Sequence, residues 1–259
     1  MIVTKRVADI CTSNADDSAY LALRDLATIA EEHTEFRIVG GHMVNLLRLA
    51  FPTSDTIERR TTDADAAIGV HIATDGRVHE RLTLLGYRAE RGNRYVFEGR
   101  TVDLLVPSGT GRFTQQRHGG RMFDAAPGLI LSRDAPHIAV SVDVTLTTGD
   151  TLTIEAPVPT VERAVILKAY ALAFRNEAKD LVDLYNLFSI ARAHSHTPEE
   201  IGGWKLDQET LTGSRKDAAR ILARTLRVVA TRTRLRGTGV SPARLQALAH
   251  GLIPGILKV

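Results

Sequence analysis

Apolar residues in the first part of the chain follow helical and strand-like spacings in turn. Apolar positions three and four residues apart predict helices over 16–33, 42–51 and 78–85. Short apolar runs predict buried strands at 36–39 and 63–70, the first of which enters a glycine turn. The same criteria predict further strands, the last two joined as a hairpin, at 87–90, 94–98, 101–106, 137–147 and 151–155.

Residues 107–123 interrupt this pattern with four glycines and with Arg112, Arg117 and Arg121. A loop of this length inside a compact domain is usually functional or disordered. We therefore expect a long functional loop here.

Helical spacing governs the C-terminal part of the chain. Pro157 and Pro159 mark a boundary, after which apolar spacing predicts helices. The predicted fold class is α+β, with an α/β domain over 1–157 followed by an all-α domain over 158–259. The expected helices of the second domain cover 160–174, 176–193, 214–234 and 241–252.

Composition narrows the class of protein. With 259 residues and 44% hydrophobic side chains, the chain is long enough to bury a core without cross-links. Cys11 is the sole cysteine, which excludes an internal disulfide and a cysteine-rich zinc site. No apolar stretch has the length of a membrane span, and the N-terminus lacks a signal-peptide core. We expect a cytoplasmic protein with no membrane partner.

Charge is distributed unevenly along the sequence. Residues 210–259 hold ten Lys or Arg and one acid, whereas the rest of the chain carries a net charge of −6. A basic end on a mildly acidic body predicts a polyanionic partner such as nucleic acid. The alternative is a solvated helix face that balances the acidic body.

Three acidic residues are candidate metal ligands. Asp63 and Asp65 are two apart in a predicted strand, so their side chains share one face. Neighbouring carboxylates repel unless a cation joins them, and Mg²⁺ prefers such oxygen ligands. Asp103 interrupts a buried-looking strand and is a candidate third acid, with Asp143 as its rival. The alternatives are a surface Asp pair and an Asp103 that is paired with an arginine.

Gly40 and Gly41 lie between a predicted strand and a predicted helix. Glycines allow a close approach of another group to the backbone, and the first N–H groups of a helix favour phosphate. The alternative is a tight turn without further function.

Two separated motifs together resemble a known family. Gly40-Gly41 followed by residues 59–65 resembles the first motif of the minimal nucleotidyltransferases of DNA polymerase β type. Residues 167–170, followed by Arg175 and residues 179–185, are similar to the second motif of the AbiEii/AbiGii toxins, which include the MenT toxins. The likeness extends over about residues 38–188.

The resemblance implies roles for individual residues. It implies a polymerase-β-type fold, a two-ion Mg²⁺ site at Asp63, Asp65 and Asp103, and catalytic roles for Lys168, Asp180 and Asp183. His42 departs from the family, which often has a small residue there. The residues implied in nucleotide binding are Gly40, Gly41, Arg59, Thr61, Thr62, Lys168 and Arg175.

The resemblance also implies an activity. Such proteins transfer nucleotides from an NTP, and MenT-like members add pyrimidine nucleotides to the 3′ end of tRNA as toxins, with a possible cognate antitoxin. Loop 107–123 would then cover the nucleotide or the acceptor end. The alternatives are a transferase that modifies a protein or a small molecule, and an inactive RNA-binding or partner-binding protein. The arginines expected to bind tRNA are Arg220, Arg224, Arg227, Arg232, Arg234 and Arg236.

Overall fold

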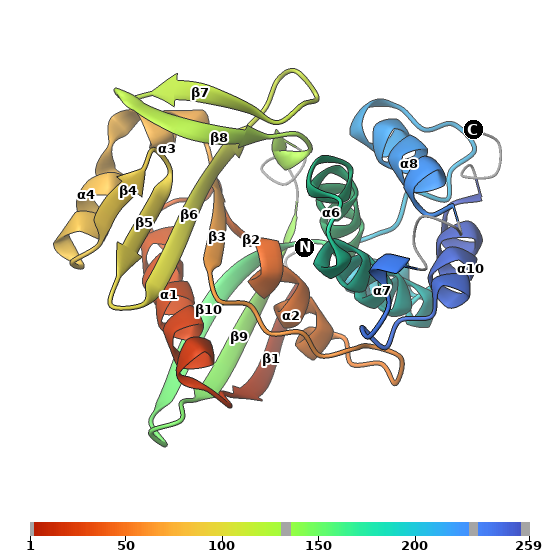
Figure 1. Ribbon diagram of the computed structural model, residues 1–259, viewed down its shortest axis with the longest axis horizontal. Helices are drawn as coiled ribbons and strands as arrows, with labels where there is room; N and C mark the ends of the chain where they lie inside the picture. Colours follow the sequence, from red (N-terminus) through yellow and green to blue (C-terminus); the bar gives the residue numbers. More distant parts are fainter. Residues whose placement is uncertain (1–2, 131–135, 228–232, 255–259) are drawn as a thin grey trace. The chain divides into compact units, whose positions relative to one another are not determined.

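The chain folds into two compact units. The computed structural model describes residues 3–130, 136–227 and 233–254 (Figure 1). Unit 1 comprises residues 1–50 and 60–159, and unit 2 comprises residues 51–59 and 160–259. The second unit therefore begins after Pro159 rather than after Pro157, and it includes residues 51–59, which we had expected in the first domain. The side-chain amide of Asn186 explains this, because it bonds both the N–H and the C=O of Ile57 at 2.8 Å.

Two β-sheets form the framework of unit 1. Within the described residues, the first sheet has the strand order β1-β9-β10. The second has the order β2-β3-β6-β5-β4, and the β7–β8 hairpin joins the end of β6 through β8 (Figure 1). Its central strands β3 and β6 are parallel, so functional groups on the two can lie side by side. The strands are β1 (Val3–Ile10), β2 (Phe36–Val39), β3 (Ala64–Ile68), β4 (Arg88–Arg91), β5 (Arg94–Phe97), β6 (Arg100–Pro107), β7 (Thr114–His118), β8 (Arg121–Ala126), β9 (His137–Thr145) and β10 (Thr151–Pro159).

Two longer helices pack on these sheets. Helix α1 (Asn14–Ala30) lies against β3, β6 and β10, and α2 (Gly40–Ala50) lies against β3 and β1. Ser13 caps α1 by accepting a hydrogen bond from the backbone N–H of Asp16, which defines the start of the helix. The core between helix and sheet includes the fully buried Leu23, Leu26 and Leu46. The shorter helices of this unit are α3 (Val70–Asp75) and α4 (Arg77–Leu84).

The prediction of a long loop over residues 107–123 is wrong. Residues 114–118 and 121–126 form the antiparallel strands β7 and β8, with His118 paired to Arg121. Gly119 and Gly120, with φ of +53° and +79°, make the two-residue turn. A two-residue hairpin turn with positive φ at both positions favours Gly-Gly, so the sequence carried the signal of a hairpin.

The strand β1 was not expected. Its sequence, VTKRVADI, places charged Lys5, Arg6 and Asp9 among apolar residues, and β1 is an edge strand that pairs only with β9 among the described strands. Edge strands tolerate polar residues on both faces, so they lack the apolar pattern of a central strand.

The regular secondary structure that is described for unit 2 consists of helices. Helix α6 (Val161–Arg175) packs against α7 (Ala178–Ala193) and α8 (Gly213–Thr225), and α7 packs against α10 (Pro242–Leu252). A short 3₁₀ helix, η1, spans Pro198–Ile201. Asn176, with a left-handed φ of +59°, separates α6 from α7. The helix expected over 214–234 ends at Thr225, and residues 228–232 lie outside the described ranges.

None of the described helices combines the length and apolarity that crossing a bilayer requires.

Candidate metal centre

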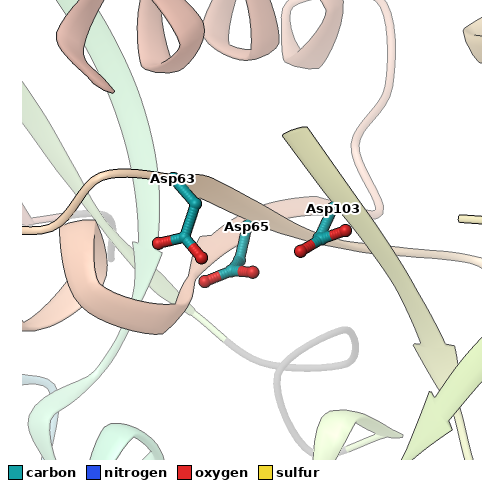
Figure 2. A group of neighbouring side chains, drawn as sticks. All are labelled: Asp63, Asp65 and Asp103. Carbon is teal, nitrogen blue, oxygen red and sulfur yellow. The ribbon is translucent and has the colours of Figure 1, made fainter. Parts of the chain in front are cut away.

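Three carboxylates meet at the centre of the seven-stranded sheet. Asp63 directly precedes β3, Asp65 lies on β3, and Asp103 lies on β6. Asp65 and Asp103 are direct partners in the parallel β3–β6 ladder, so their side chains share one face. One oxygen from each of the three carboxylates lies within 4.8 Å of the others. Figure 2 shows the three side chains in a row, with Asp65 between Asp63 and Asp103.

The position of Asp143 separates it from this group. Asp143 lies on β9, in the three-stranded sheet, where its carboxylate accepts a 2.6 Å hydrogen bond from Thr153 Oγ1. Of the two acids that the sequence left open, Asp103 is therefore the one that joins Asp63 and Asp65.

Gly40 allows Asp65 to occupy its position. Gly40 has a left-handed φ of +67°, and a Cβ atom built on it would lie 1.8 Å from Oδ2 of Asp65. Val39 at the end of β2 is the ladder partner of Asp65, which brings the glycine turn against the carboxylate. We expected another group to approach the backbone closely at this glycine turn. That group is the carboxylate of Asp65.

Replacing Gly40 with alanine is expected to displace Asp65 and to weaken metal binding. The left-handed backbone alone should lower the free energy of unfolding by about 1–2 kcal/mol, and the collision with Asp65 adds to this. Urea denaturation and a Mn²⁺ titration would measure the two effects. Gly109→Ala is the matched control, because no atom lies within 4 Å of a Cβ built there. Equal behaviour of the two variants would contradict the role assigned to Gly40.

Polar side chains hold the carboxylates of Asp63 and Asp103. Thr61 Oγ1 donates a 2.8 Å hydrogen bond to Asp63 Oδ1. Arg94 on β5 donates from Nε and Nη2 to the two oxygens of Asp103, at 3.0 and 2.5 Å. These bonds raise the pKa of Arg94 above its ordinary value against the opposing effect of burial, and the charges of the neighbouring acids add to the rise. The sequence suggested an arginine partner for Asp103 but could not identify Arg94, which is its cross-strand neighbour.

The donor set of the carboxylate group fits a hard divalent cation. Its ligand atoms are carboxylate oxygens, which suit Mg²⁺ and Mn²⁺ rather than softer metals. Neighbouring carboxylates are also costly to hold together without a cation. Asp63 and Asp65 are half-buried and Asp103 is buried, so the group is neither fully solvated nor sealed.

Unit 2 contains a second cluster of predicted residues, centred on Lys168. Its Nζ lies 2.6 Å from Oδ2 of Asp183 and 3.9 Å from Oδ1 of Asp180. Lys168 is 4% exposed, Asp180 0% and Asp183 1%. The two acids are therefore not the solvated helix charges that their spacing alone favoured.

Two arginines complete the Lys168 cluster. Arg59 donates to Asp183 from Nε at 2.8 Å and from Nη2 at 3.0 Å. Arg175 donates to Asp180 from Nη2 at 2.8 Å. Burial alone would raise the pKa of Asp183, but the charges and hydrogen bonds of Lys168 and Arg59 outweigh it and hold that pKa below its ordinary value. The cluster thus keeps the carboxylate of Asp183 ionised within the protein interior.

The remaining residues of the first motif have different environments. Thr62 is exposed and Gly41 is buried in α2. His42 is 2% exposed, with Nε2 3.1 Å from the backbone oxygen of Ala19 and its ring against Tyr20. The side chain of His42 therefore packs against α1.

A polar network beside the first motif was not expected from the sequence. Arg60 Nη1 lies 3.1 Å from Oδ2 of Asp9, and the same oxygen accepts hydrogen bonds from Tyr20 and from Asn45. The residues come from β1, α1, α2 and the segment before β3, so no local pattern links them. This network anchors the segment that leads to Thr61 and Asp63.

Exposed arginines lie on and after α8. Arg220, Arg224 and Arg227 are all exposed, and Arg227 lies beyond the end of α8 at Thr225, so the helix face that their spacing predicts does not extend to it. Arg236 is also exposed, whereas Arg234 donates to the side chain of Asn176. Arg232 lies outside the described residues.

Neither a protein-family model nor a curated protein matches the sequence.

Proposed function

We propose that this protein is a Mg²⁺-dependent nucleotidyltransferase with a polymerase-β-type catalytic domain. The observation that carries the proposal is the convergence of Asp63, Asp65 and Asp103 on adjacent parallel strands. The Asp-x-Asp pair beside a glycine turn, followed by a third acid on the neighbouring strand, is the arrangement that the family resemblance implied.

The residues of the site would position a nucleotide and neutralise its charge. Phosphoryl and nucleotidyl transfer need little covalent chemistry from the protein, so positioning and electrostatics dominate. The divalent ion would neutralise charge that develops on the transferred phosphate. Thr61 orients Asp63 through its hydrogen bond, and Gly40 provides the space for Asp65. Together they hold the two carboxylates of the Asp-x-Asp pair in fixed positions.

The Lys168 cluster offers one cation to a phosphate. The side chain of Arg175 is 40% exposed, whereas that of Lys168 is 5% exposed. The resemblance assigned both residues to nucleotide binding. Within unit 2, we assign the role of binding an anion such as phosphate to Arg175, and we give Lys168 the role of holding Asp180 and Asp183, which in turn orient Arg175 and Arg59.

The acceptor that we propose is the 3′ end of tRNA. The exposed Arg220, Arg224 and Arg227 would contact RNA phosphates without sequence preference and with strong salt dependence. Transfer of a pyrimidine nucleotide to the acceptor end would block aminoacylation and thereby translation. The protein would then act in the cytoplasm as the toxin of a toxin–antitoxin pair, with a cognate antitoxin as a further partner.

Incubation with total tRNA and each α-labelled NTP in turn tests this function. We expect label in tRNA at its 3′ end, a preference for one pyrimidine nucleotide, and no transfer when EDTA removes the divalent ions. Label in a protein or a small molecule would instead establish another acceptor. Absence of label from every acceptor, in the presence of Mg²⁺, would indicate an inactive binding protein and would refute the proposal.

A further inference from the structure

Arg37 is a buried arginine on β2, with 6% of the residue exposed. Nη1 of its guanidinium donates hydrogen bonds of 2.7 Å to the backbone oxygens of Thr34 and Phe36. Nε is buried without a hydrogen-bond partner, and Nη2 donates to no group of the described residues. A buried donor without an acceptor is costly, and a charged one more so, so this edge of the guanidinium calls for an explanation.

The same edge of two other arginines binds a carboxylate. Arg94 donates from Nε and Nη2 to Asp103, and Arg59 donates from the same two nitrogens to Asp183. This planar fork of donors matches the oxygens of a carboxylate or a phosphate. The ion pairs among the described residues do not include Arg37, so an oxyanion from outside the chain is the acceptor that its fork fits.

A small hollow beside Arg37 gives such an anion access. Arg37 lines it together with Ala67, Pro107 and Leu129, and it has room for one water-sized group, hence for one oxygen of an anion. Arg37 is the ladder partner of Ala67, which follows Asp65 by two residues on β3. Residues two apart on a strand share a face, so Arg37 and Asp65 lie on the same face of the sheet.

The charge of Arg37 is only partly compensated by the described residues. Glu35 lines the same hollow, and its charge favours the protonated guanidinium, yet burial outweighs it and holds the pKa of Arg37 below its ordinary value. Oε2 of Glu35 also lies 3.5 Å from Nδ1 of the exposed His71. A further negative charge at Arg37 would therefore stabilise the buried cation.

We propose that Arg37 binds a phosphate group, one oxygen of which enters the hollow and accepts hydrogen bonds from the Nε and Nη2 edge of the guanidinium. The fit to an oxyanion rests on Arg37 and its surroundings. The choice of phosphate rests on the proposed function, because both substrates proposed there carry phosphates. The phosphate belongs either to the nucleotide or to the RNA acceptor, and the experiment separates these two sources.

Isothermal titration calorimetry of the full chain in EDTA tests the proposal without metal and without measuring activity. The probes are pyrophosphate, which represents the nucleotide, and a short single-stranded RNA. We expect at least one probe to bind the wild type, to bind Arg37→Lys about tenfold or more weakly, and to bind Arg37→Gln more weakly still. Lysine keeps the charge but lacks the fork of donors. Loss of pyrophosphate binding assigns the site to the nucleotide, and loss of RNA binding alone assigns it to the acceptor.

A matched control removes a charge elsewhere on the same sheet. Arg88 lies on β4 with 72% of its side chain exposed, so Arg88→Gln should bind both probes like the wild type. Circular dichroism verifies that each variant is folded.

His137 locates the anion in the wild type without any substitution. Burial and, next, the charge of Arg37 lower the pKa of His137 below its ordinary value. A phosphate on Arg37 offsets that charge, so the pKa of His137, followed by NMR, should rise when the bound probe is present.

Three results would overturn the inference: no binding of either probe by the wild type, equal binding by the wild type and both Arg37 variants, or a pKa of His137 that the bound probe leaves unchanged. Arg37 would then be a buried charge whose free edge a fixed water satisfies. Failure of nucleotide transfer, with Arg37-dependent binding of a probe intact, would instead refute the proposed function and leave the anion site standing.

Discussion

Asp65→Asn is expected to abolish nucleotide transfer while the chain stays folded. Asp65 lies between Asp63 and Asp103 and against Gly40, so it is central to the carboxylate group (Figure 2). Asparagine has nearly the same shape but lacks the negative charge that a hard cation requires. Because even the outer partners of metal ligands contribute about 10–100-fold to metal affinity, loss of a ligand should reduce transfer by at least about a hundredfold. Rates of label transfer to tRNA measure this loss.

Asp143→Asn provides the control for that experiment. Asp143 is also a strand aspartate of unit 1, but it lies in the other sheet and accepts a hydrogen bond from Thr153. This variant should transfer nucleotides at nearly the wild-type rate. Retention of activity in Asp65→Asn, with its thermal unfolding unchanged, would show that the carboxylate group is not the catalytic centre.

Local patterns were sufficient for the Asp-x-Asp pair but not for the third acid. The period of two residues along a strand predicted that Asp63 and Asp65 share a face. The choice between Asp103 and Asp143 depended on which strand lies beside β3, and that pairing joins residues far apart in the sequence. Neither residue's own surroundings contain this information. Arg94 went unidentified for the same reason, since its contact with Asp103 depends on the β5–β6 register.

Burial in the helical unit was equally hard to predict. Acids at positions 180 and 183 of an amphipathic-looking helix resemble solvated charges, and Lys179 beside them indeed pairs with the exposed Glu177. The surroundings of the acids come from α6 and from residues 51–59, a segment that the sequence had assigned to the first domain. The secondary structure of α6, α7 and α10 was predicted better than any of these tertiary contacts, because secondary structure depends on short-range spacing.

Of the substitutions proposed for this protein, Asp183→Asn is expected to lower the free energy of unfolding the most. The change removes one negative charge from a buried cluster and leaves Lys168 and Arg59 without their nearest carboxylate. Breaking a buried ion pair by removal of one partner costs about 3–5 kcal/mol, because the remaining charge is desolvated and uncompensated. Urea denaturation at pH 7 measures the free energy of unfolding. Asp207→Asn, the same substitution at an exposed position of unit 2, should change it by less than about 0.5 kcal/mol.

The pH dependence separates this charge effect from a packing defect. The pKa of Asp183 lies below the ordinary value of 3.8 in the folded protein, so the carboxylate stabilises the fold fully above that value. As the pH falls below about 4, the wild type loses this contribution, whereas the asparagine of the variant does not titrate. The difference in unfolding free energy between the two proteins should therefore be full at pH 7 and shrink in acid. A difference that stayed constant down to pH 3 would mean that Asp183 stabilises unit 2 through shape and hydrogen bonding, and not through its charge.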